Sequence, residues 1–454
     1  MATQAPPKRP KPAPEALPKI LFGTSSLGNL FSEPTHEEKK AVVKEVLSAM
    51  TTPLFDSAGK YGAGLALEEL GKCLEELGVS PDKVLISNKL AWKRVPLTTP
   101  EPTFEPGAWV NLKNDAVQSI SYAGILECYE QGNELLGKYE AQIVSVHDPD
   151  EYLSSAKDDA DLAARKADVL GAYKALSELK AAGKVKSIGV GAKDISVIDF
   201  ITDHVQLDWA MFACSITPFT HTLYARQLLG KLRRQGVEVI NSAVFNAGFL
   251  IGGDHFDYQK VTRERHPDKF AWRDRFNELC AEYELKPAAV CVQFSFLFPE
   301  IVAVALNTTR PSRVKSNVEL AEAVVPASFW TRLWHEGLIS VAPRATVRHC
   351  VMFKFVEGAT DAQKLAMAEA LMGMPKKIPQ IVALSCGADL GLAGGANHDF
   401  AATVDFADAA GYELYAKHPA HVEVIQNYIK PILLPGSRTA VQFGLPSAVN
   451  KSNL

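Results

Sequence analysis

Side chains that can exchange protons follow three apolar runs in the first third of the chain. Residues 54–62 begin as an apolar run, deliver Asp56 at its end and then turn tightly around Tyr61. Two later apolar runs end in Lys89 and in His147. A carboxylate, a phenol, an ammonium and an imidazole that meet at strand ends can carry out acid–base catalysis. Taken singly, the four residues also suit ordinary roles: a helix cap, a half-buried aromatic, a solvated lysine and a hydrogen-bonded histidine.

Apolar runs and helical patterns alternate eight times over about 320 residues, which predicts an α/β fold built as a parallel (β/α)8 TIM barrel. Catalytic groups of such barrels lie at the carboxyl ends of the strands, where the four ionisable residues fall. A doubly wound sheet is the rival fold, but no Gly-x-Gly-x-x-Gly turn follows the first run. The first expected strand forms the beginning of the range 20–31. The other seven occupy 54–56, 84–89, 141–147, 185–191, 204–209, 237–242 and 301–307.

The segments between the expected strands carry helical spacing, with one long exception. Thr35 suits the cap of the first helix, and Glu38 would complete a capping box. Residues 91–114 are rich in Pro and Thr and predict a long loop, which is usually functional in a compact domain. Its aromatic side chains suit either stacking on a sugar ring or anchoring the loop. The expected helices are 35–50, 65–77, 115–136, 165–182, 223–235, 272–283 and 288–298.

The four ionisable residues, in their order and spacing, resemble the catalytic tetrad of the aldo-keto reductases. Residues 145–150 (Ser-Val-His-Asp-Pro-Asp) and 244–250 (Val-Phe-Asn-Ala-Gly-Phe-Leu) resemble the sugar-lactone-forming branch of that family, the D-threo-aldose, fucose and galactose dehydrogenases. The resemblance covers residues 19–343. It implies an NAD(P)-dependent enzyme that moves a hydride between a nicotinamide ring and the carbon of a sugar or carbonyl substrate.

The resemblance also implies a role for each member of the tetrad. Tyr61 would exchange a proton with the substrate oxygen, which requires its pKa to fall from about 10 toward neutrality. Lys89 would lower that pKa by charge attraction, and Asp56 would pair with Lys89 and orient it. His147 would hydrogen-bond the substrate oxygen.

Candidate contacts to the nicotinamide follow from the same resemblance. Gly23 and Thr24 end the first strand, and Phe245 follows the seventh strand, where many relatives stack an aromatic ring on the nicotinamide. Gln206 on the sixth strand is the candidate for the carboxamide contact, with a buried structural amide as the rival. Many relatives place an asparagine after the fifth strand, whereas this chain has Ala-Lys-Asp at 192–194.

Residues 307–317 suit an anion site, because hydroxyls, an arginine and free amides stand at a helix start, and they resemble the adenosine-phosphate segment of the family. The residues that carry this expectation are Asn307, Thr308, Thr309, Arg313 and Asn317. NADP-preferring relatives often carry Lys where this chain has Asn307, so NAD is favoured, although Arg310 or Arg313 could compensate. A capped surface helix is the alternative for this segment.

The pattern changes after Pro343 to a compact α+β unit of about 100 residues. Three stretches resemble the stress-responsive dimeric α/β-barrel (Dabb) family: 348–355, 405–406 and 415–421. The resemblance implies a ferredoxin-like sheet that pairs with a second copy, and hence a homodimer. A few relatives are polyketide cyclases, and candidate residues for that chemistry are His349, Tyr415, His418 and His421. A purely dimerising or regulatory role is the other interpretation.

Composition limits the remaining possibilities. At 454 residues the chain is longer than a single hydrophobic core usually supports, so more than one domain is expected. The formal charge of −4 gives no reason to expect nucleic acid or an anionic membrane as a partner, and no apolar window approaches the ~18 residues of a membrane span. Seven scattered cysteines predict free thiols, no metal site and a reducing, cytoplasmic location.

We therefore expect a disordered Pro-rich tail at 1–18, a barrel at 19–343, an α+β domain at 345–445 and a tail at 446–454. The function expected from the barrel is oxidation of an aldose to its lactone, or the reverse reduction of an aldehyde or ketone. Two alternatives are a non-catalytic barrel that serves as a binding subunit and an activity carried by the C-terminal domain.

Overall fold

The computed structural model describes residues 17–395 and 397–445, so the predicted tail at 446–454 and nearly all of the predicted tail at 1–18 lie outside the described residues. Internal contacts divide the chain into two units. The first unit comprises residues 1–265 and 288–323, and the second comprises 266–287 and 324–454. The predicted domain boundary at 343–345 stays a prediction.

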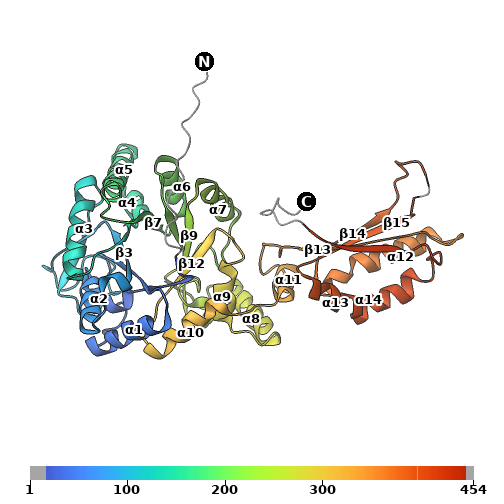
Figure 1. Cartoon of the computed structure of the whole chain (residues 1–454), viewed down its shortest axis with the longest axis horizontal. Coiled ribbons are helices and arrows are strands. Elements are labelled where there is room, and N and C mark those ends of the chain that lie inside the picture. The colour runs from blue at the N-terminus through green and yellow to red at the C-terminus, as the bar shows by residue number, and fades with distance from the viewer. Residues whose placement is uncertain (1–16, 396, 446–454) are drawn as a thin grey trace, which may run out of the picture. The chain divides into compact units, whose positions relative to one another are not determined.

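The first unit is a closed barrel of eight parallel strands, which confirms the predicted TIM barrel (Figure 1). Each strand pairs in parallel with its neighbours, and Asp56 lies opposite Ser87 while Lys89 lies opposite Ser145. The strands, in their order around the barrel, are β1 (Ile20–Gly23), β12 (Ile301–Leu306), β9 (Glu238–Ser242), β8 (Trp209–Ala213), β7 (Ser187–Ala192), β6 (Ile143–His147), β3 (Leu85–Leu90) and β2 (Leu54–Ala58).

The apolar runs fold as barrel strands because both of their faces are covered. All five residues of β2 and all five of β6 are buried. Side chains from different strands fill the barrel, and the core cluster there contains Leu21, Leu54, Ile143, Trp209, Met211, Ile240 and Ala303. The interior is therefore packed with apolar side chains.

Helices alternate with the strands as predicted. Helix α1 (His36–Ala49) begins with the predicted capping box, in which Thr35 accepts from the Glu38 amide and Glu38 accepts from the Thr35 amide. Helix α7 (Leu223–Gln235) has the predicted bounds. The others in this unit are α2 (Leu65–Glu76), α3 (Tyr122–Leu136), α4 (Pro149–Ser154), α5 (Asp159–Ala181), α6 (Ile195–His204), α9 (Pro287–Ser295) and α10 (Val314–Glu319).

Two predictions about this unit are wrong. The sixth strand is β8 and not residues 204–209, because His204 ends α6 and the fully apolar run that the barrel can bury begins only at Trp209. The segment 91–114 is not a simple loop, since β4 (Trp92–Pro96) pairs antiparallel with β5 (Asn114–Gln118). That hairpin also occupies the start of the helix predicted at 115–136.

The second unit contains the predicted ferredoxin-like α+β fold. Its antiparallel sheet has the order β14 (Ile381–Ala388), β15 (Phe400–Phe406), β13 (Val347–Phe353) and β16 (Thr439–Gly444). Helices α12 (Asp361–Met372), α13 (Ala409–Lys417) and α14 (Pro419–Val424) lie on one side of this sheet (Figure 1). Two further helices, α8 (Pro267–Glu282) and α11 (Ala327–His335), pack together in the same unit. The sheet and its helices enclose a separate core around Phe353, Met367 and Phe406.

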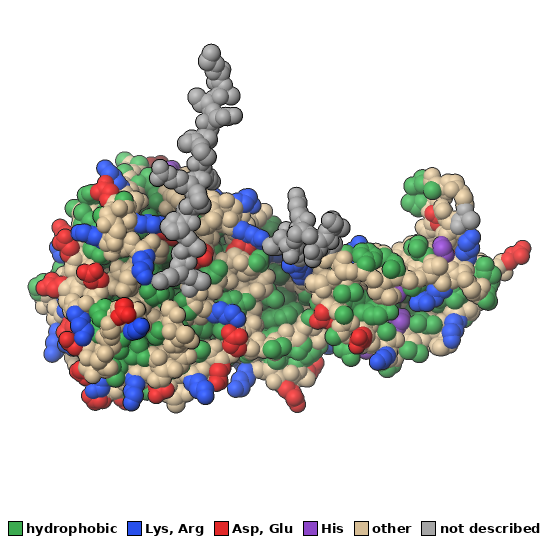
Figure 2. All heavy atoms as spheres, in the orientation of Figure 1, with side chains coloured by type: hydrophobic (Ala, Val, Ile, Leu, Met, Phe, Trp, Pro, Cys, Tyr) green, Lys and Arg blue, Asp and Glu red, His purple; other side chains and the backbone are tan. Residues whose placement is uncertain are grey.

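The surface carries charges of both signs. Acidic and basic side chains are intermixed over the visible face of each unit (Figure 2). Among the helices that the structure describes, none combines the length and the apolar composition needed to cross a membrane.

Candidate active site

The structure brings Asp56, Tyr61, Lys89 and His147 together at the carboxyl ends of the barrel strands. Asp56 on β2 and Lys89 on β3 form a direct ion pair between Oδ2 and Nζ, and only 3% and 2% of their surfaces are exposed. Ser87 donates to the other Asp56 oxygen at 3.1 Å. The Lys89 ammonium lies 4.8 Å from the centroid of the Tyr61 ring. The predicted pairing of Asp56 with Lys89 is thus present.

Two glycines position Tyr61 by allowing backbones to meet. A Cβ added to Gly28 would lie 2.8 Å from the Tyr61 carbonyl carbon and oxygen, closer than any side chain can approach. Gly62 has a φ of +61°, and a Cβ there would lie 2.3 Å from the Gly28 oxygen. The 3₁₀ turn η1 (Ser25–Gly28) is therefore pressed against the turn that carries the phenol.

His147 closes the site from β6. Its ring lies edge-on to the Tyr61 ring, with centroids 5.7 Å apart and an interplanar angle of 85°. The imidazole is 7% exposed, and its Nδ1 has no hydrogen-bond partner among the described residues. The next residue, Asp148, has a φ of +50° and places Oδ1 3.6 Å from His147 Nε2.

Burial and charge act in opposite directions on these groups. Burial raises the pKa of Tyr61 above its usual value, while the charge and hydrogen bond of Lys89 oppose that shift. Burial would lower the pKa of Lys89, but Asp56 and the phenol outweigh it, so the ammonium is retained. Burial, Lys89 and Lys60 lower the pKa of His147 well below its usual value. Lys89 thus acts on the Tyr61 pKa with the predicted sign, and burial opposes it.

The hairpin segment supplies an aromatic wall beside the tetrad. The Trp109 ring lies 6.0 Å from the Tyr61 ring, and Phe104 lies 6.1 Å from Trp109. Both are almost fully buried, at 7% and 5% exposure. Of the two roles predicted for these aromatics, anchoring the segment therefore fits Phe104, while Trp109 also lies beside the Tyr61 ring.

Sequence reasoning missed Lys60, which is buried at 2% exposure directly before Tyr61. Its ammonium lies 2.7 Å from Asp148, 2.9 Å from Glu151 and 2.9 Å from Glu105. A lysine between a glycine and a tyrosine in a turn gives no apolar period that would indicate burial. Its partners come from two distant segments, so no spacing rule connects them.

The predicted nicotinamide residues at the first strand lie beside the tetrad. Gly23 pairs with Asp56 in the sheet, and the Thr24 amide and hydroxyl both donate to the Asp56 carbonyl, at 2.9 and 3.2 Å. Thr24 thereby fixes the first loop to the strand that carries the carboxylate. Phe245 is half-buried in the loop after β9, at the same end of the barrel.

The segment 307–317 follows β12, also at the carboxyl end. Asn307 is held by Ser25, which accepts from Nδ2 at 2.7 Å, and by Ser26, which donates to Oδ1 at 3.0 Å. Arg310 and Arg313 are exposed, and neither forms an ion pair with any residue that the structure describes. A 3₁₀ turn, Pro311–Arg313, precedes the six residues of α10, so the predicted helix starts as a tighter turn. Thr308, Thr309 and Asn317 lie along this segment.

The prediction for Gln206 is wrong. Gln206 precedes β8, so it lies at the amino end of the barrel, opposite the tetrad. Its side-chain amide donates to the carbonyls of Leu207 and Gln235 at 3.0 and 3.2 Å, as a structural amide does.

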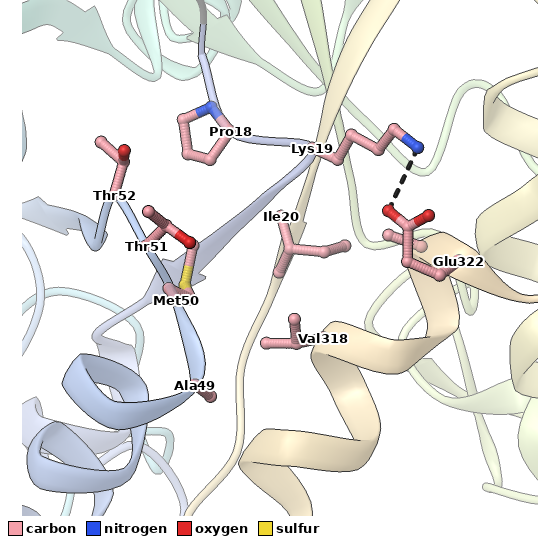
Figure 3. Close-up of a pocket in the computed structure, with 10 residues that line it drawn as sticks. Pro18, Lys19, Ile20, Ala49, Met50, Thr51, Thr52, Val318 and Glu322 are labelled. Carbon is pink, nitrogen blue, oxygen red and sulfur yellow. Dashed lines mark hydrogen bonds and ion pairs between the residues drawn. The ribbon is translucent and has the colours of Figure 1, made fainter.

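A hollow at the amino end of the barrel is separate from this site. Its lining includes Lys19 and Ile20 at the start of β1, Met50 after α1, and Val318 and Glu322 (Figure 3). Lys19 bridges to Glu322 at 3.1 Å across its edge. No member of the tetrad lines it, so it is not the candidate active site.

One cluster among the described residues has atoms close enough to surround a metal ion: His36, Glu37 and Glu76. The Lys40 ammonium already lies 2.6 Å from Glu37 and 2.9 Å from Glu76. A lysine cation therefore supplies the positive charge that these carboxylates need.

Comparison with known proteins agrees with this fold and site. Residues 19–334 match the aldo/keto reductase family, and residues 347–443 match the stress responsive A/B barrel domain. The chain belongs to the aldo-keto reductase family, and it is an oxidoreductase. Enzymes of this family use a nicotinamide cofactor, NAD(P)H.

Two relatives resemble the barrel over nearly their whole length. Pyridoxal 4-dehydrogenase of Microbacterium luteolum is 27% identical over 331 residues, which are 70% of this chain and 94% of that protein. D-threo-aldose 1-dehydrogenase of a Pseudomonas species is 25% identical over 334 residues, covering 71% of this chain and 95% of that protein. The solved structure of aldo-keto reductase AKR11C1 from Bacillus halodurans shares the fold, with a TM-score of 0.52, 17% identity and coverage of 71% and 92%.

Proposed function

We propose that the barrel oxidises an aldose at its anomeric hydroxyl to the lactone, or runs the corresponding reduction of an aldehyde or ketone. The observation that carries this proposal is the meeting of the Tyr61 phenol with the Lys89 ammonium and the His147 imidazole at the strand ends. The names of the relatives support it, since one is an aldose 1-dehydrogenase and another is a pyridoxal 4-dehydrogenase.

In the proposed mechanism each side chain handles a proton or orients one. Tyr61 takes the hydroxyl proton during oxidation and returns it during reduction. Lys89 stabilises the phenolate, and Asp56 fixes the ammonium beside the ring, because a buried cation needs a partner. His147, neutral at pH 7, hydrogen-bonds the substrate oxygen. A nicotinamide, when bound, supplies or accepts the hydride.

The residues of the chain fit a dinucleotide with phosphate groups. Two exposed guanidinium groups without a carboxylate partner in the described chain, those of Arg310 and Arg313, provide positive charge for them. The Asn307 amide is engaged by two serines and offers no cation to a ribose 2′-phosphate, so we propose NAD as the preferred cofactor. The contacts proposed for the cofactor are Gly23, Thr24, Phe245, Asn307, Thr308, Thr309, Arg313 and Asn317.

The test is a panel of aldoses and aldehydes with NAD or NADP, followed by nicotinamide absorbance. We expect turnover with at least one sugar or aldehyde and a higher kcat/KM with NAD. Replacement of Tyr61 by Phe should reduce kcat by at least about 100-fold, because it removes the proton carrier, while cofactor binding measured by fluorescence quenching persists. Near-normal turnover of Tyr61→Phe would refute the proposed mechanism.

The C-terminal unit offers a second candidate function, because it encloses a cavity of about 250 Å³. Apolar side chains line most of it, while Tyr415, His421, His349 and Arg438 supply polar groups. The Tyr415 and His421 rings stack with centroids 4.0 Å apart. His418 is outside this cavity lining and instead caps α14, accepting from the Ala420 amide at 3.2 Å.

This cavity suits the cyclase-like alternative, in which a folded β-polyketone chain is held on an apolar wall. The test incubates the full chain and its Tyr415→Phe variant with a synthetic linear β-polyketone thioester. Faster formation of an aromatic product by the wild type than by the variant, followed by its absorbance, supports this function. Equal rates for both proteins, matching the buffer, refute it.

We also propose that the chain is cytoplasmic and pairs through its C-terminal sheet. All seven cysteines are free, which suits a reducing compartment. The sheet face away from the helices carries the exposed apolar residues Met352, Val441 and Phe443, which the strand register places on one side.

A further inference from the structure

Lys60 connects three segments beneath the candidate active site. The ammonium is buried in the turn between β2 and α2 and lies 4.7 Å from the Trp92 ring centroid. One of its three carboxylate partners, Glu105, belongs to the segment between β4 and β5. The other two, Asp148 and Glu151, lie at the start of α4 after β6. Burying a lysine is costly unless its charge is paired, and three carboxylates pair this one.

Two of the three carboxylate partners, Glu105 and Asp148, extend from Lys60 toward a group that touches the substrate in the proposed mechanism or lies beside it. Glu105 accepts from Trp109 Nε1 at 2.8 Å through its second oxygen, and the Trp109 ring lies against Tyr61. Asp148 follows His147 directly, and its second oxygen lies 3.6 Å from the imidazole Nε2. Lys60 is therefore the residue before Tyr61. One carboxylate connects its ammonium to Trp109, and another connects it to His147.

We infer that Lys60 is a positioning residue of the proposed oxidoreductase site. Its ammonium fixes Trp109 against the catalytic phenol and fixes the corner at 147–148 so that the imidazole is neutral when it meets the substrate oxygen. The catalytic consequence rests on the proposed function, whereas the charge state of His147 can be measured without turnover.

The charges around His147 set the sign of the expected change. The positive groups near it are Lys89 on β3, Lys60 in the turn after β2 and Lys193 at the end of β7. The negative groups are Asp148, the next residue, and Glu151 on α4. The Tyr61 phenol faces it as well. Removing the Lys60 cation takes away one repulsive charge and leaves Asp148 and Glu151 less neutralised. Both changes favour the imidazolium, so the pKa of His147 should rise.

The experiment is an NMR pH titration of the full chain with labelled histidine side chains, in which His147→Gln identifies the His147 signal among the 11 histidines. In the wild type we expect this signal to titrate well below the usual range of a histidine. In Lys60→Met it should titrate at a higher pKa, because a repulsive cation has been removed. Lys193→Met is the matched control, because Lys193 also pairs with Glu151 but is half exposed and has no bond to Asp148 or Glu105. Equal titrations in wild type and Lys60→Met would overturn the inference.

Activity provides a second measurement that separates this inference from the proposed function. If the wild type turns over, the acid limb of kcat/KM should move to higher pH in Lys60→Met, and by less in Lys193→Met, because Lys193 acts more weakly on His147. If Lys60→Met fails to fold, the single variant Asp148→Asn is compared with the double variant Lys60→Met/Asp148→Asn. The double variant removes the buried cation together with one of its carboxylate partners. Only the double variant loses the Glu105 connection, and we expect its KM to be about tenfold higher. An equal KM in both overturns the inference, and a wild type without turnover on any substrate overturns the proposed function alone.

Discussion

At the scale of single residues, the candidate site depends on a buried ion pair rather than on exposed charges. Asp56 and Lys89 are both almost fully buried, and each is the other's main partner. Breaking a buried pair leaves an uncompensated charge in the protein interior. Stability and the proposed stabilisation of the Tyr61 phenolate therefore depend on the same two side chains.

Replacing Lys89 by Met should destabilise the barrel by about 3–5 kcal/mol, because Asp56 would remain buried and unpaired. Lys72→Met is the control, since Lys72 pairs with Glu68 at the surface, 53% exposed, where such pairs contribute about 0–1 kcal/mol. Urea unfolding followed by circular dichroism measures both. If Lys89→Met lowers the free energy of unfolding no more than Lys72→Met does, the Asp56–Lys89 pair does not stabilise the fold.

Acid should weaken the barrel through His147. The pKa of this histidine is lowered in the folded chain, so protons bind the unfolded chain more tightly. The stability contributed by the neutral form is complete above about pH 6.5 and is lost as the pH falls below it, by at most about 1.4 kcal/mol per pH unit. Unfolding free energies at pH 7 and pH 5 should therefore differ less in His147→Gln than in the wild type. The same difference in both proteins would contradict this assignment.

The four catalytic candidates could be found from sequence because Asp56, Lys89 and His147 each end a short apolar run, and Tyr61 stands in the turn after the first of these runs. That pattern reports strand ends directly, and a barrel gathers the carboxyl ends of its strands. Gln206 was misplaced because the run 204–209 contains the last residue of a helix, so the strand begins later. Lys60 gave no signal, because its burial depends on carboxylates at positions 105, 148 and 151 that meet only in the fold.

At the scale of elements, the site depends on loops that fit against each other without side chains between them. The η1 turn and the turn around Tyr61 meet through Gly28 and Gly62. In a sequence a glycine indicates a turn, but a turn residue and a packing contact look alike until the two turns are brought together. The β4–β5 hairpin was missed for a related reason, since its two strands are separated by the segment 97–113.

Gly28→Ala should push the Tyr61 turn away and reduce kcat by about 100-fold, because small misplacements of a catalytic group are costly. Gly230→Ala is the control: it lies within α7, where a Cβ would meet only the end of the Arg234 side chain at 3.6 Å. That change should leave kcat unaltered and raise helix stability by up to about 1 kcal/mol. Steady-state kinetics and thermal unfolding of both variants provide the comparison. Unchanged kcat in Gly28→Ala would show that the turns adjust freely.

At the scale of the molecule, the exposed apolar residues of the C-terminal sheet predict a dimer. Val441 and Phe443 are 52% and 44% exposed on the side of the sheet away from its helices. The double variant Val441→Lys/Phe443→Lys should sediment as a monomer where the wild type sediments as a dimer. Leu414→Lys, on α13 and 59% exposed, is the control and should remain dimeric. A wild type that sediments as a monomer at micromolar concentration would refute the pairing.

The division of the chain into units has a consequence for how such a protein could lose its appended part. Helix α8 belongs with the C-terminal unit, although it precedes the last strand of the barrel. There it packs on α11, where Arg275 bonds Glu336 through two nitrogens and Tyr283 meets Phe329 edge-on, with centroids 5.2 Å apart. Proteolytic trimming after residue 343 would remove the sheet and leave both helices on the remaining fragment. A cut between α8 and α11 would separate the pair instead, so the appended part is lost cleanly only beyond the end of α11.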